Sequence, residues 1–73
     1  MAKNINWVTT RDEAIEQFEI NELPGVQQLY EQDGIPDTIA RRESWHNFVD
    51  WLNKNYQISD WQIANWSIPE ICG

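Results

Sequence analysis

The sequence predicts an all-α fold, a small bundle of three to four short helices around one aromatic-rich core. Apolar residues recur at helical spacing, capping patterns precede two of these stretches, and no segment alternates apolar and polar residues over a useful length. The 73 residues form one domain at most, and the single cysteine excludes an intramolecular disulfide. We therefore expect one domain over residues 1–73, with residues 1–9 extended or flexible and residues 68–73 as a tail.

The first two helices are expected in the N-terminal half. Thr10 opens the capping pattern T-R-D-E, which predicts a helix over residues 11–19. Its buried residues are predicted to be Ala14, Ile15 and Phe18. Pro24 is compatible with a first helical turn, so a second helix is expected over residues 24–32. The residues predicted to point inward from this helix are Val26, Leu29 and Tyr30.

The third helix, over residues 37–54, has the clearest pattern. Its apolar residues follow the i, i+3, i+4, i+7 spacing of one buried helix face. These residues are Trp45, Phe48, Val49 and Leu52. Asn55 is predicted to close the helix in a left-handed conformation.

A short fourth helix is expected after Ser59, because Ser59 and Gln62 form a second capping box. Ile58 and Ile63 flank this start as a hydrophobic staple. The helix is expected to end by Ser67, ahead of a proline.

Four of the five tryptophans lie between residues 45 and 66. The helical pattern places Trp45 and Trp66 in the core, and Trp51 and Trp61 at its flank or on the surface. Exposed tryptophans are common hot spots of protein interfaces, so Trp51 and Trp61 are candidate partner-binding residues. Alternatively, Trp51 packs under the first helix or the N-terminal segment, and Trp61 packs under residues 68–71.

A second group of candidates is acidic. Asp12, Glu16 and Glu19 fall at i, i+4 and i+7 on the first helix, beside its apolar face. A row of fixed carboxylates can imitate phosphate groups and occupy the basic groove of a nucleic-acid-binding protein. The alternative is a solvated helix face, whose acids are favoured by the helix dipole.

The composition argues against several classes of function. Twelve acids and five bases give a net charge of −7, which opposes direct binding to nucleic acids or anionic membranes. No run of residues approaches a membrane span, and the N-terminus lacks a signal-peptide core, which favours a cytoplasmic location. His46 has no second ligand at helical spacing and there is only one cysteine, so no metal site is expected. The neighbouring carboxylates lie on an exposed face where so short a chain builds no cleft, so no catalytic centre or cofactor is expected. The protein is therefore not expected to be an enzyme.

Arg41 and Arg42 form the one basic pair, with Asp37, Glu43 or a weakly held phosphate as expected partners.

Residues 42–69 resemble a loose set of small phage- and prophage-encoded helical proteins, largely uncharacterised. The shared pattern is R-x-x-W-x-x-F-x-D-x-L, followed by I-S-x-x-Q-x-x-x-W-x-x-P. The matching residues are Arg42, Trp45, Phe48, Asp50, Leu52, Ile58, Ser59, Gln62, Trp66 and Pro69. The chain departs from this pattern at Tyr56, where glycine is expected, so that Asn55 would have to supply the turn. The resemblance implies a phage-accessory context and carries no catalytic residue.

Together, these features favour a small acidic phage-type protein that acts by stoichiometric protein–protein binding. Its expected role is to inhibit a host defence or nucleic-acid-handling protein, in the manner of anti-CRISPR or anti-restriction proteins. The expected partner is a host protein with a basic nucleic-acid-binding surface, in the host cell cytoplasm. One alternative is a self-associating assembly protein, such as a homodimer joined through Trp51 and Trp61. A helix-turn-helix DNA-binding module is disfavoured, because its recognition helix would carry Asp60 and no Lys or Arg.

Overall fold

The computed structural model describes residues 10–73, and the segment expected to be extended, residues 1–9, lies outside this part. The described residues form four α-helices and a final 3₁₀ turn, and no strand occurs among them. The prediction of an all-α fold is confirmed. The elements are α1 (Arg11–Asn21), α2 (Leu23–Tyr30), α3 (Thr38–Lys54), α4 (Asp60–Asn65) and the 3₁₀ turn η1 (Glu70–Cys72).

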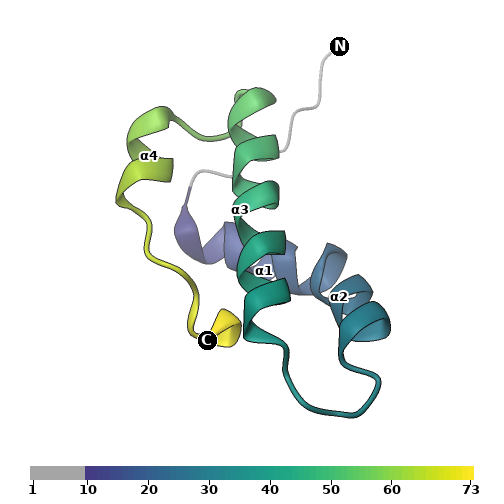
Figure 1. Cartoon of the computed structure of the whole chain (residues 1–73). Coiled ribbons are helices and arrows are strands. Elements are labelled where there is room, and N and C mark those ends of the chain that lie inside the picture. Colours follow the sequence, from purple (N-terminus) through teal and green to yellow (C-terminus); the bar gives the residue numbers. More distant parts are fainter. Residues whose placement is uncertain (1–9) are drawn as a thin grey trace.

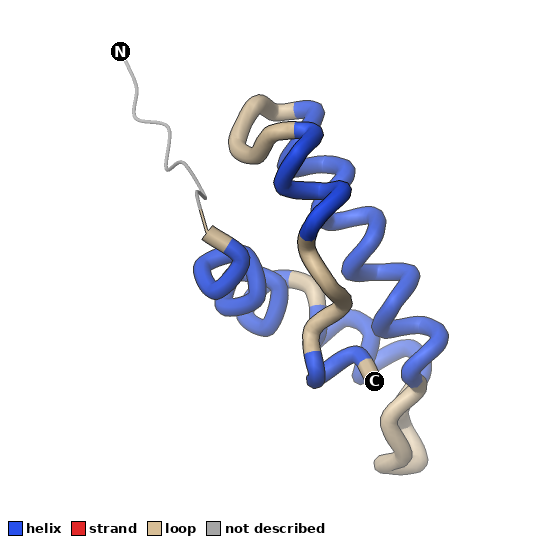
Figure 2. The backbone as a smooth tube through the Cα atoms, turned by 90° about the vertical axis from the view of Figure 1, so that its left-hand side faces the viewer, coloured by secondary structure: helices blue, strands red, loops and turns tan. Residues whose placement is uncertain are grey.

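The long helix α3 is the central element, and every other element packs against it. In Figure 1, α1 crosses behind α3, α2 lies on one side of it, and α4 lies on the other side near its C-terminal end. After α4 the chain runs back along α3, so that η1 lies against the N-terminal end of that helix (Figure 2). As a result, α4 packs near the C-terminal end of α3 and η1 packs near its N-terminal end.

The core forms where α1 crosses α3. Phe18 meets Trp45 edge to face with ring centroids 5.5 Å apart, and it lies 6.0 Å from Phe48. The predicted buried face of α3 is confirmed. Trp66 is only partly buried, but it packs beside Trp45 with ring centroids 6.5 Å apart. The buried apolar residues are Ala14, Phe18, Leu23, Val26, Trp45, Phe48, Val49, Leu52, Ile58 and Cys72.

Helices α1 and α2 follow one another almost without a break. The hydroxyl oxygen of Thr10 accepts a hydrogen bond from the Glu13 amide at 3.1 Å, so the predicted N-cap is confirmed. Only Glu22 separates α1 from α2. Because Pro24 has no N–H to continue the hydrogen-bond ladder, the chain turns there and starts a new helix. The turn buries Leu23, which begins α2.

The prediction for the inward side of α2 is wrong in part. Val26 is buried, but Leu29 and Tyr30 are 69% and 59% exposed. Both residues line a groove between α2 and α3 that no other part of the described chain fills. The helical spacing therefore predicted the correct side of α2 but not the separation of the two helices.

Helix α3 ends in a Schellman motif. The Tyr56 amide donates to the Asn53 carbonyl oxygen at 3.0 Å, and the Gln57 amide donates to the Leu52 carbonyl oxygen at 2.9 Å. The left-handed residue is Tyr56, with φ of 61°. The prediction of Asn55 at this position is wrong, because Asn55 has φ of −96° and continues the last turn.

The start of α4 is as predicted. The Gln62 amide donates to the Ser59 hydroxyl oxygen at 3.2 Å, and the Ser59 amide donates to the Gln62 side-chain oxygen at 2.7 Å. Ile58 is buried and Ile63 packs partly buried against the core, as expected for a hydrophobic staple. These contacts hold α4 on the C-terminal half of α3.

Candidate functional site

The acidic candidates on α1 face solvent. Asp12, Glu16 and Glu19 are all exposed, while α1 directs Ala14 and Phe18 into the core. Because the buried residues anchor one side of the helix, the carboxylates are held at fixed spacing on its other sides. The three residues therefore form the exposed acidic row that the sequence predicts.

The basic side chains of the described residues form no ion pair with the acidic row, and other parts of the chain bind them instead. Within residues 10–73 the basic residues are Arg11, Arg41, Arg42 and Lys54. The three arginines all donate to backbone carbonyl oxygens between residues 67 and 73. The ammonium group of Lys54 lies 3.0 Å from the Asp50 carboxylate. Within residues 10–73, none of these cations forms an ion pair with Asp12, Glu16 or Glu19.

Several carboxylates remain without a partner. Six of them make no side-chain hydrogen bond and no ion pair within residues 10–73. They are Asp12, Glu16, Glu19, Glu22, Glu43 and Glu70. Exposed charges of one sign create a potential that attracts a partner of the opposite sign.

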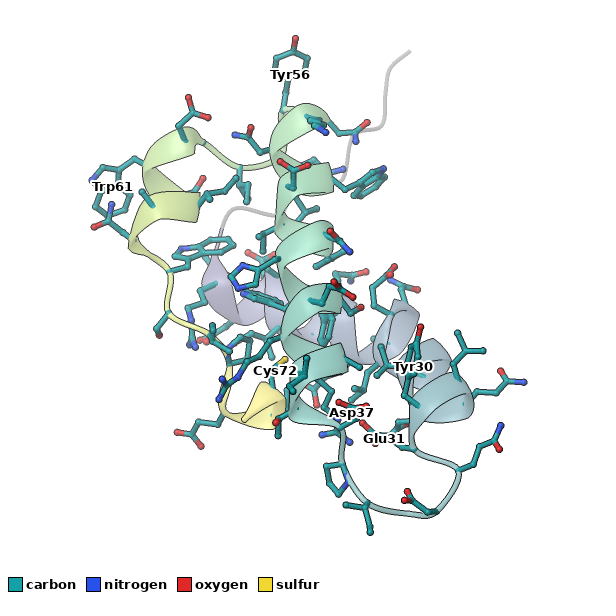
Figure 3. All side chains as sticks on the ribbon, viewed as in Figure 1. Tyr30, Glu31, Asp37, Tyr56, Trp61 and Cys72 are labelled. Atoms are coloured by element: carbon teal, nitrogen blue, oxygen red, sulfur yellow. The ribbon has the colours of Figure 1, made fainter. Side chains whose placement is uncertain are left out.

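The tryptophan candidates are both exposed, Trp51 to 53% and Trp61 to 70%. The Trp51 ring stacks on Phe48, with centroids 6.4 Å apart and planes 14° apart. Trp61 points outward from α4 (Figure 3). Since Trp51 lines the groove with α2 and α4 packs on α3 alone, the two tryptophans belong to different surfaces.

A groove of about 520 Å³ separates α2 from α3. Its apolar lining comes from both helices and consists of Val26, Leu29, Tyr30, Ala40, Phe48 and Trp51. Two of the unpartnered carboxylates, Glu22 and Glu43, also line it. The structure thus brings one predicted candidate, Trp51, together with apolar and acidic residues from α2 and the first half of α3.

An ion pair fixes one end of this groove. Arg41 donates from Nε and Nη2 to the two carboxylate oxygens of Glu31, each at 2.6 Å. The two side chains are 10% and 5% exposed, and the Asp37 amide adds a third hydrogen bond to Glu31 at 3.0 Å. Figure 3 shows Glu31 and Asp37 together where α2 passes into α3. The pair therefore ties the C-terminal end of α2 to the first turns of α3.

The electrostatics of this pair keep it charged. The hydrogen bonds from Arg41 lower the pKa of Glu31 below its usual value. The same hydrogen bonds raise the pKa of Arg41. A bidentate arginine–carboxylate pair also fixes the relative orientation of the elements that carry it.

The carboxylate partners predicted for the two arginines are wrong. Arg41 does not pair with Asp37 or Glu43, because the turn after α2 brings Glu31 to it from ten residues earlier. Arg42 donates instead to the carbonyl oxygens of residues 72 and 73, each at 3.3 Å. Both arginines thus hold the C-terminal segment on α3.

Cys72 closes this region from the other side. Its thiol is buried and lies 3.6 Å from the Arg41 carbonyl oxygen. Burial raises the pKa of the Cys72 thiol. A buried, protonated thiol packs as a small apolar side chain and is a poor nucleophile.

Sequence reasoning missed the contribution of α2 to the groove. Leu29 and Tyr30 were expected to point inward, and Glu43 was one of three alternative partners for the arginine pair. Of the apolar residues of α2, Leu23 and Val26 are buried, whereas Leu29 and Tyr30 are exposed.

No protein-family model, curated protein or solved structure matches this chain. Within residues 10–73, no three or more His, Cys, Asp or Glu side chains are grouped to hold a metal ion. None of the helices described is both long and apolar enough to span a membrane.

Proposed function

We propose that this protein acts by stoichiometric binding to a second protein with a basic surface. The proposal is best supported by the difference between the basic side chains, which have partners within the described chain, and the acidic ones, several of which do not. The basic side chains within residues 10–73 are engaged by the chain, whereas six carboxylates have no partner there. A basic partner can therefore pair with these acids without breaking any internal ion pair of the described residues.

The geometry of α1 favours a partner that binds phosphates. Successive members of the row lie about 6 Å apart along the helix, from the rise per residue. Because Ala14 and Phe18 hold α1 in the core, this spacing does not depend on a flexible loop. The proposed role is therefore inhibition of a nucleic-acid-handling or host defence protein, whose phosphate-binding surface the row of Asp12, Glu16 and Glu19 would occupy.

The test begins with capture of the partner from host lysate by the tagged protein, followed by measurement of association and dissociation rates. The variant Asp12→Asn/Glu16→Gln/Glu19→Gln removes the row. The control Gln27→Lys/Gln28→Lys/Ala64→Lys changes the net charge by the same amount at other exposed positions.

We expect the row variant to associate at least about tenfold more slowly at low salt, with little change in dissociation, because exposed charges act mainly on the encounter rate. This difference should vanish between about 50 and 500 mM salt as the Debye length shrinks. Equal association rates for the row variant and the control would contradict the role of the row.

Self-association is the second candidate, favoured by the exposure of Trp51 and Trp61. Sedimentation velocity would then show a dimer that Trp51→Ala/Trp61→Ala converts to a monomer. A wild-type monomer at concentrations of tens of micromolar would contradict this candidate. A helix-turn-helix role is disfavoured, because α4 has six residues, begins with Asp60 and carries no basic side chain.

A further inference from the structure

We propose that the groove between α2 and α3 binds a short amphipathic helix of the partner. The helix would insert apolar side chains between α2 and α3 and would place Lys or Arg side chains against Glu22 and Glu43. This inference rests on the proposed function and adds where the partner binds and in which conformation.

The apolar lining of the groove is only half covered by the fold. Leu29, Tyr30 and Trp51 are 69%, 59% and 53% exposed, and all three line this one groove. Val26 and Phe48, which are buried, lie beneath them. Large apolar and aromatic side chains gathered at one groove are typical of a surface that a partner desolvates.

The dimensions of the groove suit a helix of about three turns. The eight residues of α2 extend about 12 Å, and residues 40–51 of α3, which include those that line the groove, extend about 18 Å. A helix places anchors at i, i+3 or i+4, and i+7 within that length. A volume of about 520 Å³ accommodates several aliphatic side chains. Strand addition, the other common mode, needs a free strand edge, and residues 10–73 contain no strand.

The charges on the groove specify a basic helix. Glu22 and Glu43 both line it and have no partner within the described residues. The arginines that precede Glu43 in the sequence are bound elsewhere: Arg41 pairs with Glu31, and Arg42 donates to carbonyl oxygens of the C-terminal segment. Cations of the incoming helix therefore meet free carboxylates beside the apolar lining.

The groove is also preorganised. The Glu31–Arg41 pair joins its two helices at one end. Near the middle, Val26 of α2 and Phe48 of α3 are buried in the common core. Rigid walls reduce the ordering cost that a partner must overcome on binding.

Isothermal titration calorimetry with a designed peptide tests the inference without knowledge of the natural partner. The peptide is a helix of Leu, Ala and Lys, about five turns long, with Leu on one face and Lys beside it. One control peptide has the same composition with Leu distributed around the helix, and a second is a proline-rich peptide with the same number of Lys. We expect the amphipathic peptide to bind at least about tenfold more tightly than either control.

Matched variants locate the site. Leu29→Gln changes a groove residue, and Ile39→Gln changes an aliphatic residue that is 79% exposed on α3 and does not line the groove. We expect at least about tenfold weaker binding for Leu29→Gln and less than about twofold change for Ile39→Gln. Glu22→Gln/Glu43→Gln should weaken binding more than Asp12→Asn/Glu16→Gln, which removes the same number of charges. All of these sites are exposed, so the fold should be retained.

The outcomes separate this inference from the proposed function. Equal weakening by the two charge variants, with no effect of Leu29→Gln, would overturn the groove and leave a general acidic attraction. Binding of the proline-rich peptide as tight as that of the amphipathic one would overturn the helical occupant. A wild-type dimer that Leu29→Gln dissociates would assign the groove to a second copy of the chain, which also contradicts the inference.

Discussion

Replacement of Tyr56 by glycine should stabilise the protein, although it removes a large side chain. Tyr56 has φ of 61°, the left-handed conformation that closes α3. A residue with a Cβ atom pays about 1–2 kcal/mol for this conformation, which glycine adopts freely. The two hydrogen bonds of the motif, from the amides of Tyr56 and Gln57, involve backbone atoms only and survive the change.

The magnitude follows from the exposure of the side chain. Tyr56 is 81% exposed and points away from the end of α3 (Figure 3), so its removal sacrifices little packing. Glycine also gives the unfolded chain more conformational freedom, which lowers stability by about 0.4–1 kcal/mol. The net gain is about 0.5–1 kcal/mol, which corresponds to a rise in Tm of about 2–8 °C for a domain of this size.

Thermal denaturation followed by circular dichroism measures this effect, with Asn55→Gly as the matched control. Asn55 has φ of −96°, and its side-chain amide donates to the Trp51 carbonyl oxygen at 2.8 Å. Glycine there relieves no strain and loses this hydrogen bond, so Tm should fall. A rise in Tm for Asn55→Gly together with a fall for Tyr56→Gly would refute the assignment of the left-handed residue.

Two further predictions concern the core and the ion pair. Trp45→Ala removes a side chain that is 2% exposed and should lower the free energy of unfolding by about 3–5 kcal/mol, with loss of helical circular dichroism. Trp66→Ala, at a partly buried site, should lower it by less. Because Arg41 lowers the pKa of Glu31 from its ordinary 4.5, the carboxylate stabilises the folded state above that pH, and this contribution is lost as pH falls through the lowered pKa. The urea midpoint of Glu31→Gln should therefore fall less between neutral and acidic pH than that of the wild type, and parallel pH profiles would contradict this role.

The features predicted from the sequence are those that depend on neighbours within one or two turns. The Ser59 capping box involves residues three positions apart, and the buried face of α3 is defined by the spacing of four apolar residues. Such local patterns determine where a helix starts and which side faces the core. The exposed acidic row on α1 follows from the same reasoning.

The features that the sequence did not predict depend on how far apart the helices lie or on a shift of one residue. Leu29 and Tyr30 were expected to point inward, but both are exposed and line the groove between α2 and α3. Arg41 pairs with Glu31 because the turn between α2 and α3 brings the two side chains together. The spacing of residues within one helix cannot predict such a contact. The left-handed residue that closes α3 was predicted at Asn55 and is Tyr56, one position later. Helix ends are where local sequence determines a boundary least well.

The most direct test of the account is the indole N–H signal of each exposed tryptophan during a titration with the amphipathic peptide. Trp51 lines the groove between α2 and α3, whereas Trp61 points outward from α4. In ¹H–¹⁵N spectra of the labelled protein, we expect the Trp51 indole signal and the amides of residues 22–30 and 40–51 to shift, while the Trp61 indole signal stays in place. A shift of Trp61 with an unchanged Trp51 would contradict the claim that the acidic, aromatic groove is where this protein binds a basic partner.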